Sequence, residues 1–200
     1  KIDLGSLIVE GTFGQIFKGK LTTEKVETPI DDDSGPPITK LEVTPVYIKM
    51  PKESATEEQT DTMLKDCVAF RALKHKNLSP IIGICYQENH KPFTVFTACE
   101  LGNLKHYLTE LRNTKLKNND FLMQLTNQTS FSEHPLISTQ ELLFIMLQMF
   151  KALNYLHGKQ ILHRDVATRN CWLDTNLSLK LADNGLSRDL FPDDYHCLAN

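Results

Sequence analysis

Residues 163–170 read HRDVATRN, and the chain continues at 183–185 with DNG. Short strands are predicted around residue 161 and across 172–181, and Asp165, Asn170 and Asp183 lie next to the ends of these strands. Carboxylate and amide oxygens are the ligands that Mg²⁺ prefers. These residues therefore form a candidate site for magnesium and phosphate.

Two features upstream extend this pattern. The segment 10–14, EGTFG, separates two predicted strands, and its glycines would let backbone amides approach a phosphate closely. Lys49 ends a V-x-I-K pattern in the third predicted strand. The order and spacing of these features match the phosphoryl-transfer machinery of protein kinases.

The motif HRDVATRN resembles HRDLAARN of protein tyrosine kinases, and the resemblance covers the whole chain. The tail at 183–198, DNGLSRDLFPDDYHCL, is similar to Ryk-type receptors, the Wnt-binding pseudokinase branch, with DN in place of DF. The resemblance implies an α+β protein kinase-like fold. It would have a five-stranded antiparallel N-lobe sheet plus helix C, and the first part of a mainly helical C-lobe.

Composition agrees with a globular domain. The 200 residues carry a net charge of −3, with 40% hydrophobic and 24% charged residues, which excludes a wholly disordered or fibrous chain. This near-neutral balance argues against nucleic acid as the main partner. Five cysteines without a C-x-x-C pair predict neither a disulfide framework nor a zinc site, and the scattered histidines predict no metal site.

The two ends of the chain predict a piece of a longer protein. The start lacks Met and the features of a signal peptide. A kinase C-lobe continues beyond the activation segment, so we expect more chain after residue 200. The longest apolar stretch, 142–150, is too short to cross a membrane.

The expected organisation has two parts. Residues 1–101 form the kinase N-lobe and hinge, with a flexible insert at 21–40 that is rich in Pro, Gly and Asp. Residues 102–200 form a partial C-lobe, with a polar insert at 112–135 and the start of the activation segment at 183–200.

Within the first part, local patterns predict five strands and one helix. The strands are a hairpin across 4–20 and single strands at 44–50, 77–87 and 91–98; the helix is at 57–73.

The second part is predicted to be mostly helical. A short helix is expected at 104–111, and a longer one ends near Gly158. Ser138, three residues before Glu141, is typical of a capping box at the start of this longer helix. Short strands are expected around Ile161 and across 172–181.

The nucleotide-binding residues depart from the family pattern. Val9 replaces the first glycine of the loop, whereas Gly11 and Gly14 remain; a bare hairpin turn explains EGTFG about as well as phosphate binding. At the position of the glutamate that usually pairs with this lysine, the chain has Asp66. Its side chain is shorter than that of glutamate by one methylene, or about 1.5 Å. The alternative is that Lys49 and Asp66 are ordinary charges.

Three large rings stand where the resemblance places the adenine slot. Tyr47 occupies the position of the roof alanine, Trp172 that of the floor leucine, and Phe96 the gatekeeper position. We expect these rings to block the pocket by occupying the space that adenine needs. The alternative is that each ring turns outward.

The catalytic positions are intact. The resemblance implies that Asp165 is the base, Arg169 its neighbour, and Asn170 with Asp183 the magnesium ligands. The alternative is structural, because such residues also hold loops by hydrogen bonds to the backbone.

Two residues are expected to be regulatory. Asn184 replaces the phenylalanine that completes an apolar stack in kinases, with Phe70, Ile81 and His163 as its other members, so we expect a weakened stack and an inactive conformation. Tyr195 in the activation segment is either a phosphorylation site, a docking tyrosine or a packed side chain.

Three functional hypotheses follow. The first is an intracellular pseudokinase domain of a Ryk-type Wnt receptor, which signals through conformation and protein docking. The second is a weakly active ATP- and magnesium-dependent tyrosine kinase, and the third is a nucleotide-sensing switch. No cofactor is predicted unless the pocket opens to ATP and magnesium. The resemblance implies signalling proteins and other receptors as partners, an extracellular Wnt-binding region, and a place on the cytoplasmic side of the plasma membrane.

Overall fold

The computed structural model describes residues 1–27, 38–86, 90–114 and 137–195. The chain divides into two compact units. Unit 1 comprises Lys1–Arg71, Pro80–Ala98 and Gly185–Asn200, and unit 2 comprises Ala72–Ser79 and Cys99–Asn184. We describe each unit by itself.

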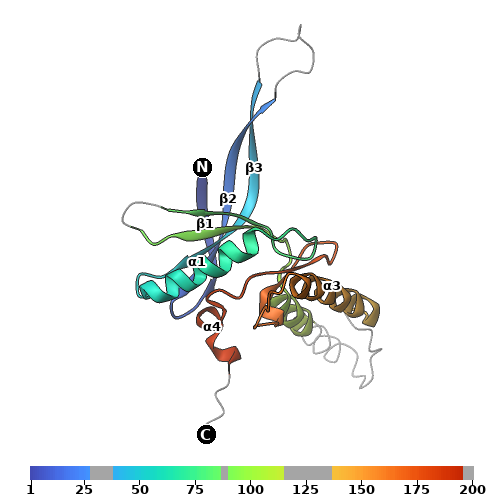
Figure 1. The fold of residues 1–200 in the computed structure, drawn as a ribbon. Coiled ribbons are helices and arrows are strands. Elements are labelled where there is room, and N and C mark those ends of the chain that lie inside the picture. The colour runs from blue at the N-terminus through green and yellow to red at the C-terminus, as the bar shows by residue number, and fades with distance from the viewer. Residues whose placement is uncertain (28–37, 87–89, 115–136, 196–200) are drawn as a thin grey trace, which may run out of the picture. The chain divides into compact units, whose positions relative to one another are not determined.

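Unit 1 contains an antiparallel five-stranded sheet (Figure 1). The strand order is β1-β2-β3-β5-β4. The strands are β1 (Ile2–Glu10), β2 (Gly14–Glu27), β3 (Ile38–Pro51), β4 (Ile81–Cys85) and β5 (Phe93–Thr97). This sheet confirms the predicted N-lobe architecture.

One face of the sheet forms the core of unit 1. Because side chains alternate along a strand, β3 and β5 each send every second residue to this face. The buried cluster consists of Val46, Ile48, Phe93 and Val95. Ile48 and Val95 are direct cross-strand partners, so the register places these branched side chains together.

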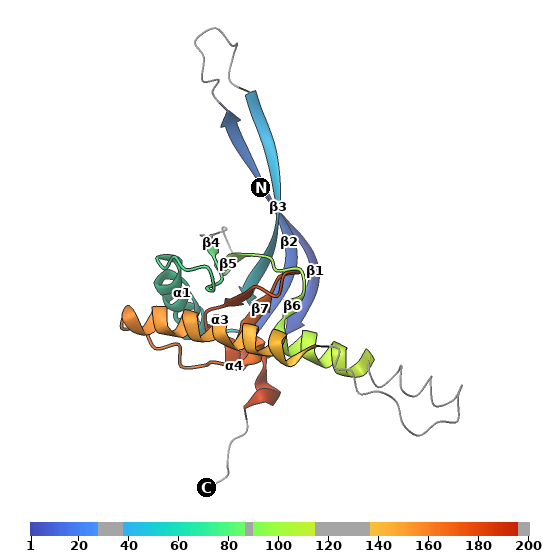
Figure 2. The ribbon, with the colours of Figure 1, turned by 90° about the vertical axis from the view of Figure 1, so that its right-hand side faces the viewer.

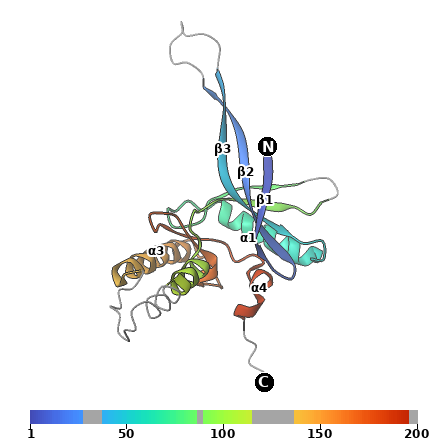
Figure 3. The ribbon, with the colours of Figure 1, turned by 180° about the vertical axis from the view of Figure 1, so that it is seen from behind.

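The prediction of a flexible insert at 21–40 is wrong for residues 21–27 and 38–40, which belong to strands β2 and β3. Pairing of β2 with β3 continues without interruption from Gly14↔Pro51 to Glu27↔Ile38 (Figure 3). The flanks of the Pro- and Asp-rich segment are strand-forming, because they are rich in β-branched residues such as Thr22, Thr23 and Thr39. Residues 28–37 lie outside the described residues.

Helix α1 (Glu57–Arg71) follows β3, close to the predicted range 57–73. Its buried side chains recur at helical spacing and are Thr60, Met63, Cys67 and Phe70. The ammonium of Lys91 holds the connection from β3 to α1. Its Nζ donates to the backbone oxygens of Lys52, Glu53 and Ala55 at 3.0, 2.7 and 2.5 Å.

Unit 2 is built around helix α3 (Thr139–Gly158). The predicted capping box is confirmed, because Glu141 N donates to Ser138 Oγ and Ser138 N donates to the Glu141 carboxylate. The buried residues of α3 are Ile145, Gln148, Ala152 and Leu156. Within the described residues, no helix is both long and apolar enough to span a membrane.

A second helix in unit 2 is longer than predicted. Residues 104–114 are helical, so the helix continues into the predicted polar insert at 112–135. Thr109 and Thr114 lie on this helix, and each hydroxyl donates to the carbonyl four residues earlier. Residues 115–136 lie outside the described residues.

The predicted strands at Ile161 and across 172–181 are corrected. Residues 161–163 are not a strand, and 172–181 divides into β7 (Cys171–Leu173) and β8 (Leu179–Leu181). Asp174 ends β7 because its carboxylate accepts the N–H groups of Asn176 and Ser178, which closes a turn.

A two-residue strand, β6 (Gly102–Asn103), completes the small sheet of unit 2 in the order β6-β7-β8. Figure 2 shows this sheet beside α3. Strands β7 and β8 form a hairpin in which Cys171 pairs with Leu181. The segment before Cys171 and the segment after Leu181 carry the residues of the candidate site.

Candidate functional site

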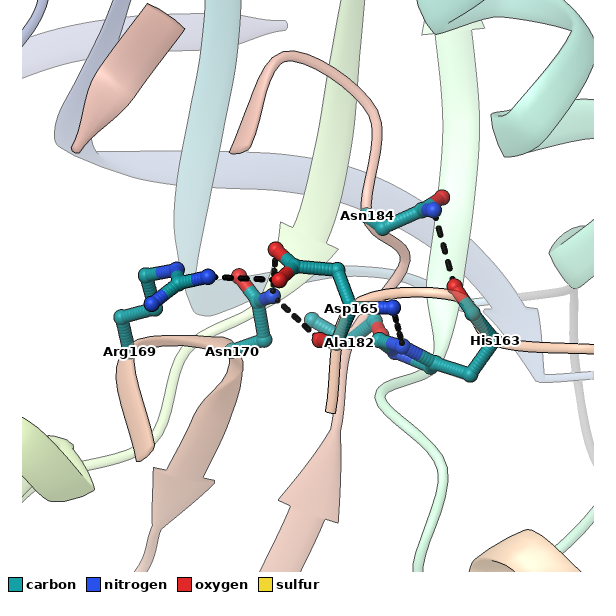
Figure 4. Close-up of polar contacts among 6 residues, drawn as sticks. All are labelled: His163, Asp165, Arg169, Asn170, Ala182 and Asn184. Atoms are coloured by element: carbon teal, nitrogen blue, oxygen red, sulfur yellow. Dashed lines mark hydrogen bonds and ion pairs between the residues drawn. The ribbon is translucent and has the colours of Figure 1, made fainter. Parts of the chain in front are cut away.

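Two predicted catalytic residues of unit 2, Arg169 and Asn170, both donate hydrogen bonds to the carboxylate of a third, Asp165 (Figure 4). Arg169 donates to Asp165 Oδ1 at 2.5 Å, and Asn170 Nδ2 donates to Asp165 Oδ2 at 2.7 Å and to the Asp165 carbonyl at 2.8 Å. The short helix η1 (Thr168–Asn170) brings the two donors round to Asp165. The structure thus brings together Asp165, Arg169 and Asn170.

This geometry fits both roles proposed for Asp165. The donors Arg169 and Asn170 hold the carboxylate in one orientation, as a general base requires. The same two donors would also fix the loop without any chemistry. The catalytic role of Asp165 therefore stays a prediction.

His163 is a scaffold residue of this loop. Its Nδ1 accepts the Asp165 N–H at 3.3 Å, which places the ring proton on Nε2, 2.7 Å from the Ala182 carbonyl. The Ala182 N–H in turn donates to the Asn170 carbonyl at 2.9 Å. The neutral ring thus ties the loop to the end of β8.

Asn184 makes a polar contact that phenylalanine would not make. Its Nδ2 donates to the His163 carbonyl at 2.8 Å (Figure 4). The side chain therefore ties the residue after Asp183 to the catalytic loop. Phe70 is buried on α1 in unit 1, and the proposed four-residue stack stays a prediction.

The candidate magnesium ligands Asn170 and Asp183 are both buried in unit 2. The Asn170 side-chain nitrogen donates to Asp165, and the amide oxygen is the side-chain atom that could ligate a metal. Across the described ranges, no group of three or more His, Cys, Asp or Glu side chains is arranged to hold a metal ion. An amide and a carboxylate fit Mg²⁺ only if nucleotide phosphates supply further oxygens.

In unit 1, the face of the sheet opposite the core carries Tyr47, Lys49 and Phe96. Tyr47 on β3 and Phe96 on β5 are direct cross-strand partners, and all three residues are buried. The Lys49 ammonium lies 5.7 Å from the centroid of the Phe96 ring, a cation–π contact. The two rings and the lysine therefore form one cluster, which we call the ring cluster.

The other two predicted nucleotide-site residues lie elsewhere. Asp66 is half-buried on α1, and its pairing with Lys49 stays a prediction. Trp172 is buried on β7 in unit 2, opposite Asn103 on β6 and Lys180 on β8. Its predicted contribution to an adenine slot likewise stays a prediction.

The glycine loop (residues 10–14) is a closed hairpin turn. Gly11 N donates to Gly14 O at 2.9 Å, and Val9 is a strand residue paired with Ile16. Lys52 Nζ lies 2.7 Å from the Glu10 carboxylate, and this hydrogen bond lowers the pKa of Glu10. Val9, at the position of the missing first glycine, thus belongs to the paired part of β1.

Asp183 and Asn184 of the activation segment belong to unit 2, and the segment belongs to unit 1 from Gly185 onward. It forms helix α4 (Ser187–Leu190) and the short helix η2 (Pro192–Asp194). The Thr12 N–H of the glycine loop donates to the Asp189 carbonyl at 2.8 Å. Tyr195 lies under the guanidinium of Arg188, 5.1 Å from carbon Cζ to the ring centroid.

Two buried thiols have pKa values above the usual range. Burial raises the pKa of Cys99 to about 11 and that of Cys171 to about 12. Both side chains are therefore protonated at neutral pH and are poor nucleophiles. Among the described residues, Cys67, Cys85, Cys99 and Cys171 are not in disulfides.

Comparison with known proteins decides the family. The sequence profile described as "Protein tyrosine and serine/threonine kinase" matches residues 2–200. The chain belongs to the protein kinase family. The kinase fold predicted from HRDVATRN is therefore confirmed.

Individual relatives support the Ryk-type resemblance. The chain is 36% identical to tyrosine-protein kinase RYK of Mus musculus over its whole length. It is 28% identical over its whole length to tyrosine-protein kinase Dnt of Drosophila melanogaster. It is also 30% identical to the inactive tyrosine-protein kinase RYK of Caenorhabditis elegans, over 97% of the chain. The chain spans 29%, 28% and 33% of the lengths of these relatives.

Sequence reasoning missed two features of this kinase chain. One is the buried amide pair Asn77 and Gln148, whose only local signal is a single polar residue inside an apolar helical run. The other is the contact of α4 with the glycine loop, for which the sequence offers no local signal. Both join segments that are far apart in the chain.

Proposed function

We propose that the chain is the intracellular pseudokinase domain of a Ryk-type Wnt receptor. It signals through its conformation and by docking other proteins, with little or no phosphoryl transfer. The domain lies on the cytoplasmic side of the plasma membrane in a single-pass receptor whose extracellular region binds Wnt. Similarity to tyrosine-protein kinase RYK over the whole chain supports this assignment.

The ring cluster is the observation that carries the proposal. Tyr47 stands where the kinase family has a small roof residue, and it is buried directly opposite Phe96. The ring of Phe96 also contacts Lys49, the residue expected to bind the α and β phosphates. Binding of ATP would require both rings and the ammonium to change their contacts, which disfavours nucleotide.

Asn184 supports the same function. In an active kinase, the residue at this position packs as an apolar ring, whereas Asn184 hydrogen-bonds to the His163 carbonyl. This contact favours one fixed arrangement of residues 183–185. The Caenorhabditis elegans relative carries the word "inactive" in its name, which agrees with the proposal.

Tyr195 is the proposed regulatory residue of the domain. Its ring contacts the Arg188 guanidinium, which would pair with a phosphate added to the tyrosine hydroxyl. The alternative role of Tyr195 is that of a docking tyrosine for a signalling protein, in which the phosphate stays available to that partner.

A weakly active tyrosine kinase is the second candidate function. The arrangement of Asp165 with Arg169 and Asn170 favours it, because a general base must be held in a fixed orientation. Asn170 and Asp183 would hold Mg²⁺ together with the nucleotide phosphates. Bound magnesium would neutralise the charge of the transferring phosphoryl group. A third possibility, nucleotide sensing without catalysis, needs the ring cluster to open.

A phosphotransfer assay separates the first two functions. Purified full-length protein is incubated with ATP, Mg²⁺ and a tyrosine peptide, beside the variant Asp165→Asn. We expect wild type and variant to show the same background signal. Transfer by wild type that Asp165→Asn abolishes would instead establish the weak kinase.

A further inference from the structure

Strands β2 and β3 extend beyond the other strands of the sheet as a two-stranded ribbon (Figures 1 and 2). Pairing of β3 with β5 begins only at Val46, the partner of Thr97. Among the strands that the structure describes, the outer edge of β3 is therefore unpaired from Thr39 to Val43. We call this five-residue stretch the free edge. An unpaired strand edge is a template on which another strand can pair.

The backbone of the free edge is directed toward such a strand. The Ala98 N–H donates to the Pro45 carbonyl at 3.2 Å, so Pro45 directs its carbonyl to the outer side of β3. The register of β2 with β3 contains no bulge, and backbone groups in an antiparallel strand alternate between its two sides. Thr39, Leu41 and Val43 therefore direct three N–H and three C=O groups to the outer side.

One face of the ribbon carries an exposed apolar stripe. Because side chains alternate between the two faces of a strand, Leu41 and Val43 share a face with Val26, which lies diagonal to Leu41 on β2. These three side chains are 63%, 56% and 62% exposed. Exposed apolar residues beside an unpaired edge favour association with another strand.

The other face of the ribbon carries charges. Lys25 and Lys40 are direct cross-strand partners, an unfavourable arrangement of like charges. Lys25 Nζ lies 2.5 Å from the Glu42 carboxylate, which compensates this lysine. Lys40 makes no ion pair with the residues that the structure describes. The free edge thus carries an uncompensated lysine two positions from a glutamate on the same face.

We propose that the free edge pairs with the free edge of a second copy of this chain, antiparallel and centred on Leu41. Leu41 then lies opposite Leu41 of the second copy, and Thr39 opposite Val43. These are hydrogen-bonded pairs, because their backbone groups point outward. Lys40 lies opposite Glu42 in a non-hydrogen-bonded pair, where side chains are closer together. By symmetry, the dimer contains two such ion pairs.

The charges also select this register. Centring the pairing on Lys40 would place two lysines opposite each other, and centring it on Glu42 would place two glutamates opposite each other. Only the register centred on Leu41 brings opposite charges together and also joins the apolar stripes of the two copies. The inference goes beyond the proposed function, because this pairing requires neither nucleotide nor catalysis.

Charge exchange between two differently tagged preparations of the purified full-length protein tests the pairing. Capture of one preparation by the other is measured as a function of concentration. Lys40→Glu against itself and Glu42→Lys against itself each place like charges opposite each other at both ion pairs. We expect either combination to raise the dimer dissociation constant at least about tenfold above that of wild type.

Mixing Lys40→Glu with Glu42→Lys restores opposite charges at both positions, and we expect capture close to that of wild type. Such rescue would also show that both variants are folded. The matched control is Glu24→Lys, the same charge change at an exposed position on β2, away from the free edge. It should be captured like wild type.

Rescue by the mixed pair, with loss of capture in the two like-charge pairs, supports the proposal. The proposal is overturned if wild type shows no concentration-dependent capture, if Lys40→Glu captures itself as well as wild type does, or if the mixed pair stays as weak as its members alone. Phosphotransfer by the wild type would refute the proposed function and leave the pairing of free edges standing.

Discussion

Replacing Gln148 with alanine is expected to lower the free energy of unfolding by about 3 kcal/mol. Gln148 Oε1 accepts from Asn77 Nδ2 at 2.9 Å and from Leu179 N at 3.0 Å, and its Nε2 donates to Leu177 O at 2.8 Å. The alanine variant would leave these groups without their partner inside unit 2. Buried polar groups that lose a partner each cost about 1–3 kcal/mol.

The measurement is thermal and urea unfolding of the variant beside Gln140→Ala. Gln140 lies on the same helix, α3, and is exposed, so its loss should change stability by less than about 0.5 kcal/mol. For Gln148→Ala, we expect a fall in melting temperature of about 10 °C. Equal melting temperatures for the two variants would show that the buried amide pair contributes nothing.

Opening the ring cluster is expected to create nucleotide binding. In the double variant Tyr47→Ala, Phe96→Thr, both rings leave the face of the sheet that also carries Lys49. Adenosine and ATP should then bind at least about tenfold more tightly than to wild type, a gain of about 1.4 kcal/mol. Adenosine is included because it needs no contact with the glycine loop.

Thermal shift on adding each ligand measures this gain against the variant's own unliganded melting temperature. The matched control is Phe93→Thr, which removes a ring of the same strand from the opposite, core face. The control should be destabilised and gain no ligand shift. Ligand shifts that are alike in both variants would exclude the ring cluster as the obstacle.

Features coded by local pattern could be predicted from the sequence. The strands β4 and β5 and the helices α1 and α3 follow from hydrophobic spacing, and the cap of α3 follows from Ser138 and Glu141. The grouping of Asp165, Arg169 and Asn170 follows from their closeness within one motif. These interactions span few residues, so short segments of sequence determine them.

Features that depend on pairing between distant segments could not be predicted from the sequence. The flanks of the predicted insert at 21–40 contain β-branched residues, but they are recognised as strands only when β2 pairs with β3 on both sides of the Pro- and Asp-rich segment. Strand β6 has two residues and exists through its pairing with β7. The contact between Thr12 and Asp189 joins the two ends of the chain, so local preferences carry no signal for it.

The function of the candidate site was harder to predict than its residues. The sequence retains Asp165, Asn170 and Asp183, and by themselves these favour catalysis. The unusual residues Tyr47, Phe96 and Asn184 point the other way, and their effect depends on where the side chains lie. The burial of Tyr47 opposite Phe96, and the hydrogen bond of Asn184, could be learned only from the structure.

Calorimetric titration of wild-type full-length protein with ATP, in the presence and absence of Mg²⁺, tests the pseudokinase account most directly. We expect no saturable heat under either condition, because the ring cluster opposes binding. Saturable micromolar binding under either condition would contradict the account, and a requirement for Mg²⁺ would favour the weakly active tyrosine kinase.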